Sequence, residues 1–324
     1  MQTNRIGGIW FFSLFILCLT LSRPAFAFEW ELNLLGESRK ARALHLITST
    51  YSPKVRAQKV STHERNDCKI ERYHVVGRDP VDKKDRTIRI ASYRTHGAVA
   101  QKRAVIIVPS IVGTTLLENW YADLFCRNEV RALVIENIER DTPVDVSIAS
   151  YDRAALRKLA AIRHLAEFLY SERYIRVGVL GTSQGALAAS LALGVERKIK
   201  AGALIAGGGD LAEIVADSTE QSQAALREQR MKAFGYRNRD EYLRALKEQI
   251  VINNLDFVGY TGFKPVWMSV VRGDTVVPTR TQMALVKALK PKRVVYYDGD
   301  HVGGIIKTYF VSSPAIVDFF RAAL

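Results

Sequence analysis

The sequence has few cysteines, and they form no pattern that indicates a metal site. It contains 3 Cys and 6 His among 324 residues, with no Cys-x-x-Cys motif or His/Cys cluster of the kind that holds zinc. So few cysteines also exclude a disulfide-dense miniprotein. With 9 Pro, 21 Gly and 48% hydrophobic residues, the chain is neither a collagen-like fibre nor a disordered tail. Its length suits one large globular domain or two small ones.

Motifs for binding nucleotides and nucleic acids are also lacking. No Gly-x-Gly-x-x-Gly follows an expected strand, and no phosphate-binding loop with its lysine occurs, so we expect no cofactor. A net charge of +14 and a pI near 9.7 would suit a nucleic-acid binder. However, the basic residues are spread over many segments and form no tracts interleaved with aromatics. We therefore expect no nucleic-acid partner, while a weak association with an anionic envelope surface stays open.

One long apolar run is present, and it lies at the N-terminus. Arg5 precedes the largely apolar segment Ile6–Ser22, and the small-residue pattern Ala25-Phe26-Ala27 follows it. This is the layout of a secretory signal peptide, residues 1–27, with cleavage after Ala27. It predicts a periplasmic or secreted protein. A retained membrane anchor is the competing interpretation, because the run is at the short edge of what spans a bilayer.

Two cysteines, Cys68 and Cys126, would remain after cleavage. In an oxidising compartment they are able to form a disulfide. Two unpaired buried thiols are the alternative, and the sequence does not decide between them.

Apolar strands alternate with helical segments from residue 104 onward. Continuous apolar, β-branched runs are typical of strands covered on both faces, and they occur at Ala104–Val108, Ala132–Ile135, Val177–Leu180, Ala203–Ile205, Val266–Val271 and Val294–Tyr297. Upstream of them we expect a helix at Glu37–Ile47 and strands at Tyr73–Val76 and Thr87–Tyr93. The alternation predicts an α/β fold with a doubly wound, mostly parallel sheet flanked by helices.

The longest predicted helix, Ala154–Tyr170, is amphipathic. Five aliphatic residues share one face of it, namely Leu156, Leu159, Ile162, Leu165 and Leu169. We expect its basic residues to form the solvated face; they are Arg153, Arg157, Lys158 and Arg163.

A helical insertion interrupts the alternation. About 60 residues of helical character separate the strand ending near Ala206 from the one starting near Val266, and Asn238 with Glu241 resembles the start of a capped helix. We expect a helical cap insertion at about residues 211–258, over the carboxyl edge of the sheet, where ligands bind in such folds. With no internal repeats, residues 28–324 are expected to form one domain that includes this cap.

The motif Gly181-Thr182-Ser183-Gln184-Gly185 carries the strongest functional signal. It directly follows the apolar strand Val177–Leu180 and opens a helix of small residues, Ala186–Leu193. A nucleophilic serine on a tight turn from strand to helix needs small flanking residues, because the backbone there is strained and closely packed. A glycine-rich turn with a capping serine is the alternative interpretation.

In this motif and its context the sequence resembles the α/β-hydrolase superfamily, of the serine hydrolase or esterase type. The resemblance covers about residue 87 to the C-terminus. It implies the chain order serine, acid, histidine, with the acid after the next-to-last strand and the histidine after the last. Asp274 and His301 occupy those places. The resemblance therefore implies that Ser183 is the nucleophile, His301 the general acid/base and Asp274 the orienting acid.

Other residues near these positions are given different roles. The rival acids Asp210, Asp298 and Asp300 are expected to be loop acids or contacts of the histidine loop. Trp120 and Tyr121 complete a helical stripe with Leu117 and Leu124, so we expect them in the core rather than in a pocket.

Two backbone N–H groups would form the oxyanion hole. One is that of Gln184, immediately after the nucleophile. The resemblance places the second in the loop Pro109–Gly113, where the family often has a His-Gly pair that this chain lacks. Ile111 is the expected donor, with Ser110 or Val112 as alternatives.

The implied function is hydrolysis of a carboxylic ester, a small-molecule acyl substrate, through an acyl-enzyme on Ser183. A thioesterase or a peptidase with the same triad stays open, because the triad determines acyl transfer and not the leaving group. A non-catalytic binding protein with this fold is a further alternative. The acyl chain length depends on how residues 211–258 fold.

Overall fold

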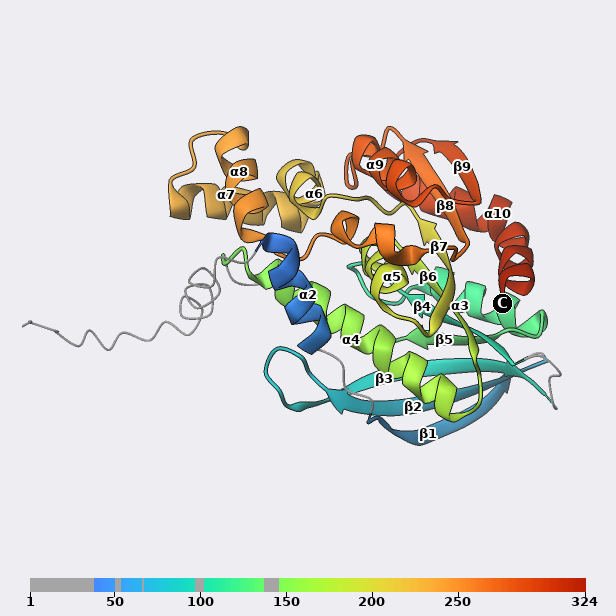
Figure 1. The fold of residues 1–324 in the computed structure, drawn as a ribbon. Coiled ribbons are helices and arrows are strands. Elements are labelled where there is room, and N and C mark those ends of the chain that lie inside the picture. The colour runs from blue at the N-terminus through green and yellow to red at the C-terminus, as the bar shows by residue number, and fades with distance from the viewer. Residues whose placement is uncertain (1–37, 50–53, 66, 97–101, 137–145) are drawn as a thin grey trace, which may run out of the picture. The chain divides into compact units, whose positions relative to one another are not determined.

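In the described residues, nine strands form one sheet in the order β1-β2-β3-β5-β4-β6-β7-β8-β9 (Figure 1). The computed structural model describes residues 38–49, 54–65, 67–96, 102–136 and 146–324. Residues Arg39–Leu324 form one compact unit. The signal peptide predicted for residues 1–27 lies outside the described residues.

From β4 onward the strands follow the apolar runs of the sequence. They are β1 (Arg56–Arg65), β2 (Cys68–Arg78), β3 (Asp85–Thr95), β4 (Arg103–Val108), β5 (Arg131–Ile135), β6 (Arg176–Thr182), β7 (Ile199–Ile205), β8 (Val266–Arg272) and β9 (Arg293–Asp298). From β5 to β9 the neighbouring strands are parallel. The strands β1, β2 and β3 extend the sheet as an antiparallel edge against β5. The predicted α/β fold with a mostly parallel sheet is confirmed.

Helices cover both faces of this sheet. They are α2 (Arg39–Ser49), α3 (Leu116–Arg127), α4 (Ser150–Ser171), α5 (Gln184–Val195), α6 (Leu211–Asp217), α7 (Gln221–Phe234), α8 (Arg239–Gln249), α9 (Thr279–Leu289) and α10 (His301–Ala323). Alternate residues of β4 point to opposite faces: Ile106 belongs to the buried cluster that includes residues of α2, α4, α5 and α9, whereas Ile107 belongs to the one that includes residues of α3 and α10. Both faces of the central strands are therefore buried, as their continuous apolar runs predict.

One strand was not predicted. The sequence Arg-Ala-Gln-Lys-Val-Ser-Thr-His-Glu-Arg of β1 is exposed along its whole length, so it carries no alternation of apolar and polar residues. It pairs with β2 through backbone hydrogen bonds. A strand that buries no side chain leaves no hydrophobic pattern in its sequence.

The prediction for the basic residues of α4 was wrong at two positions. Lys158 and Arg163 are only 4% and 6% exposed. Arg163 donates to the carbonyl of Ile47 at 2.6 Å and pairs with Glu196 at 3.3 Å, while Lys158 donates to the side-chain oxygen of Gln184. Their partners come from distant parts of the chain, which helical periodicity does not reveal.

The two cysteines form a disulfide, Cys68–Cys126, which joins β2 to α3 across 58 positions. On the same helix Tyr121 is buried as predicted, and Trp120 packs on Tyr309 of α10 with ring centroids 5.4 Å apart.

Within the described part of the chain, no helix is both long enough and apolar enough to cross a membrane.

Candidate active site

Ser183 lies on a strained turn between β6 and α5. Its φ and ψ of 55° and −118° place it at positive φ, which a residue with a side chain seldom adopts. The flanking glycines permit close approach: a Cβ on Gly181 would lie 2.3 Å from the carbonyl oxygen of Gly185, and one on Gly185 would lie 2.2 Å from that of Val108. The small residues predicted around the serine are therefore required sterically.

The three residues predicted as a triad form one chain of hydrogen bonds. His301 Nε2 lies 2.8 Å from Ser183 Oγ, and His301 Nδ1 lies 2.6 Å from Asp274 Oδ2. Ser183 follows β6, Asp274 follows β8 and His301 opens α10 after β9. Because parallel strands end at the same edge of a sheet, residues far apart in sequence meet there. All three are at least nine-tenths buried, which strengthens the electrostatic interactions among them.

Backbone and side-chain donors hold the carboxylate of Asp274 in one orientation. Its Oδ1 accepts from the backbone N–H groups of Val276 and Val277, both at 2.9 Å. Its Oδ2 accepts from Gln282 Nε2 at 2.8 Å. Gln282 is fully buried, and its Oε1 accepts from the N–H of Val271 at 3.0 Å. Gln282 was not predicted, because a single glutamine in a helix after the acid carries no motif.

The rival acids serve other contacts. Asp210 caps α6, where its side chain accepts from the N–H of Glu213. Asp298 pairs with Arg272 at 3.0 Å. Asp300 caps α10, accepting from the N–H of Gly303 at 2.6 Å. Asp210 and Asp300 lie outside the regular elements, as predicted, whereas Asp298 is the last residue of β9. Asp300 in addition caps the helix that begins with His301.

The predicted oxyanion donors lie on the segments that meet at the elbow, the turn from β6 to α5 that carries Ser183. Gln184 is the first residue of α5, where backbone N–H groups have no acceptor within the helix. The carbonyl groups of Val108 and Pro109 pack against Gly185, so the loop containing Ile111 begins beside the first turn of α5. That Gln184 and Ile111 supply the two donors stays a prediction.

A cavity of about 50 Å³ borders Gln184. It lies between α4, α5, α6 and the segment after α8, and its lining includes Leu187, Leu211 and Asn254. Lys158 also lines it. Apolar residues flank this lysine three and four positions away on either side, but its partner Gln184 lies 26 positions along the chain, which helical periodicity does not reveal.

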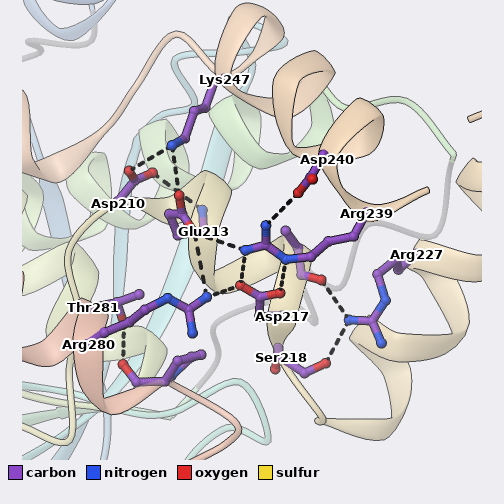
Figure 2. A network of polar contacts seen from close by, with 12 residues as sticks. Asp210, Glu213, Asp217, Ser218, Arg227, Arg239, Asp240, Lys247, Arg280 and Thr281 are labelled. Carbon is purple, nitrogen blue, oxygen red and sulfur yellow. Dashed lines mark hydrogen bonds and ion pairs between the residues drawn. The ribbon is translucent and has the colours of Figure 1, made fainter.

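Helix α6 of the predicted cap is joined to α8 and to α9, the helix that follows the loop of Asp274. Figure 2 shows Glu213 and Asp217 of α6 between cations of α8 and α9: Lys247 lies 2.7 Å from Glu213, Arg239 lies 2.5 Å from Asp217, and Arg280 pairs with Asp217. Burial raises the pKa of Glu213, but the hydrogen bond and charges of these cations outweigh it and lower that pKa.

A second connection lies next to the acid itself. Thr219 donates its N–H to the carbonyl of Thr275 at 3.0 Å, and the two hydroxyls are 2.8 Å apart. Because Thr275 follows Asp274 directly, these bonds join the segment after α6 to the residue next to the acid.

The described ranges contain no group of three or more His, Cys, Asp or Glu side chains that could hold a metal ion.

Comparison with known proteins identifies the fold. No model of a known protein family matches the sequence, and no protein with a curated function matches it. Solved structures do match. An acetyl xylan esterase from a Paenibacillus species is 16% identical, with a TM-score of 0.64 over 88% of this chain and 93% of that chain.

Two further structures give the same result. A cold-adapted esterase from an Arctic intertidal metagenomic library is 13% identical, with a TM-score of 0.55 over 82% of this chain and 99% of that one. The acylaminoacyl peptidase of Pyrococcus horikoshii is 13% identical, with a TM-score of 0.54 over 83% of this chain and 50% of that one. The chain therefore has the α/β-hydrolase fold.

Proposed function

We propose that the protein is a serine hydrolase that cleaves a small-molecule carboxylic ester through an acyl-enzyme on Ser183. The hydrogen-bonded chain from Ser183 through His301 to Asp274 is the observation that carries this proposal. The esterases among the structures of similar fold add support.

The geometry suits acyl transfer in two steps. In the first, His301 Nε2 takes the hydroxyl proton as Ser183 Oγ attacks the ester carbonyl, and then gives that proton to the departing alcohol. In the second, His301 takes a proton from the water that attacks the acyl-serine, and then gives it to Ser183 Oγ as the bond between Ser183 and the acyl group breaks and the acid leaves. Asp274 accepts from Nδ1–H, which keeps Nε2 free to accept and stabilises the imidazolium in both steps.

The oxyanion of each tetrahedral intermediate would accept hydrogen bonds from the backbone N–H groups of Gln184 and Ile111. Donors already in place cost no reorganisation when the charge develops. This part of the proposal rests on where Gln184 lies in α5 and on the loop that begins beside it.

Export from the cytoplasm belongs to the same proposal. The layout of residues 1–27 is that of a signal peptide, and the Cys68–Cys126 disulfide suits an oxidising compartment. We propose a periplasmic or secreted enzyme.

Turnover of p-nitrophenyl esters of graded chain length tests the proposal, with the matching thioesters and anilides assayed in parallel. The native protein should hydrolyse the esters and Ser183→Ala should not. Ser190→Ala, on the same helix, removes a hydroxyl that bonds to Asn254 and Leu187 and should keep the activity. Turnover by Ser183→Ala equal to that of the native protein would overturn the assignment of Ser183 as nucleophile. Faster turnover of thioesters or anilides than of esters would show that the substrate is a thioester or an amide instead.

A further inference from the structure

Lys158 of α4 is a buried cation beside the elbow. It is 4% exposed, and its ammonium donates to the side-chain Oε1 of Gln184, the residue that follows the nucleophile. The triad and the fold do not by themselves account for a lysine at this place.

The first turn of α5 lacks the capping that helices ordinarily have. Ser183 occupies the N-cap position but makes no side-chain hydrogen bond to the helix. Its Oγ lies instead 2.8 Å from His301. A serine at an N-cap ordinarily accepts from the backbone N–H of the second or third helical residue. Using Ser183 as nucleophile therefore leaves this turn without a side-chain cap, and backbone hydrogen bonds and packing are what restrain it.

Packing alone does not supply that restraint at Gln184. Its side chain borders the cavity of about 50 Å³, whereas a side chain in a close-packed interior is held by its neighbours on all sides. The hydrogen bond from Lys158 ties Gln184 to α4, and the backbone of Gln184 carries the expected oxyanion donor.

The positive charge of Lys158 also favours a role in the reaction. The N-terminus of a helix carries positive partial charge, which favours an acidic side chain nearby and disfavours a cation. A cation beside the positive end of α5 therefore does not stabilise the helix dipole. It is well suited to an anion that develops at that helix end during the reaction.

We propose that Lys158 is a positioning residue for the oxyanion site. It holds Gln184 so that the backbone N–H of Gln184 faces the developing oxyanion, and its charge adds positive potential there. This inference rests on the proposed function, because it assigns a role within the same reaction.

Lys158→Met tests it, since methionine is of similar length and carries no charge. We expect kcat for p-nitrophenyl esters to fall about tenfold. This is less than the fall expected when a group that donates directly to the oxyanion is removed. KM should change by less than about twofold. Arg157→Met is the matched control, because it also replaces a cation with methionine, one residue along the same helix. Arg157 pairs with Asp79 at 3.1 Å, and its replacement should leave kcat unaltered. Lys158→Arg should retain most of kcat, because the adjoining cavity offers room for the larger group.

A double-mutant cycle tests whether Lys158 affects kcat through its hydrogen bond to Gln184. If Lys158 acts through Gln184, replacing it in a Gln184→Met background should cost much less than in the native protein. Thermal melts of every variant should remain cooperative. A kcat equal to that of the native protein in a folded Lys158→Met variant would overturn the inference, and so would a loss confined to KM. The Ser183→Ala result is independent, so a failure of the proposed function remains distinguishable from a failure of this one.

Discussion

The imidazole of His301 lies 2.8 Å from the hydroxyl of Ser183, although 118 positions separate the two residues. Ser183 follows β6 and His301 follows β9, and these parallel strands end at the same edge of the sheet. The same edge carries Asp274, whose carboxylate completes the hydrogen-bonded chain. These contacts lead to predictions that separate the chemistry from the stability of the fold.

Replacing Asp274 with Asn should lower kcat by about 10³- to 10⁴-fold, because an amide in place of the carboxylate favours the wrong imidazole tautomer. The hydrogen bonds from the backbone N–H groups of Val276 and Val277 can persist to the amide oxygen, so the fold should survive. Steady-state kinetics and a thermal melt measure the two effects. Asp298→Asn, at a rival acid that pairs with Arg272, should keep kcat within about twofold; a large loss there would instead favour Asp298 as the acid.

Removing the disulfide should reduce stability and leave turnover intact. A crosslink across 58 positions restricts the unfolded chain, and the chain-entropy relation gives about 4 kcal/mol for it. Cys68→Ser with Cys126→Ser should therefore unfold at lower urea concentration, with kcat unchanged in the folded protein. Identical urea midpoints for the native protein with and without reductant would contradict this account of the crosslink.

Stability should fall in acid because of Glu71 on β2. Burial raises the pKa of Glu71, but the hydrogen bond and charge of Arg94 outweigh it and lower that pKa to about 2. A carboxylate with a lowered pKa in the folded state stabilises it above the unfolded value of 4.5, and this contribution is lost as the pH falls from 4.5 towards 2. It amounts to at most about 3 kcal/mol, less what solvent screening of Arg94 removes.

Urea unfolding at a series of pH values measures this effect. Glu71→Gln should be less stable than the native protein at pH 7 and should lose less stability between pH 4.5 and 2. Parallel curves for the two proteins over that range would show that Glu71 is not the titrating group.

The ion pairs between α6 and α9 should contribute a small, salt-sensitive amount. Arg280 pairs with Asp217 and is 56% exposed, so Arg280→Gln should cost less than about 1 kcal/mol at low ionic strength. The difference from the native protein should shrink in 0.5 M salt, because exposed charges are screened. A difference that does not depend on salt would indicate that Arg280 acts by packing.

The buried strands and the candidate triad were accessible from the sequence for a physical reason. A strand covered on both faces must be apolar throughout, so β4 to β8 are visible as runs of residues such as Ile106 and Ile107. Ser183 is recognisable because the turn that exposes it requires glycine on both sides. Once the strands and the elbow are placed, the resemblance to the α/β-hydrolase superfamily implies the strands after which an acid and a histidine follow.

Contacts between distant segments were not accessible in this way. The exposed strand β1 is held by backbone pairing with β2 and leaves no pattern in its side chains. Gln282 supports Asp274 from a helix whose docking the sequence does not specify. Lys158 was assigned to solvent because a charge on an amphipathic helix ordinarily faces water; its burial depends on Gln184, 26 positions away.

Mapping the site of covalent labelling by an active-site fluorophosphonate tests the central claim most directly. The reagent needs a serine activated by its histidine, so its use does not depend on knowing the substrate. We predict one adduct per chain, found on the peptide that contains Ser183 and absent from both Ser183→Ala and His301→Ala. An adduct on another serine, or labelling that persists in Ser183→Ala, would contradict the account.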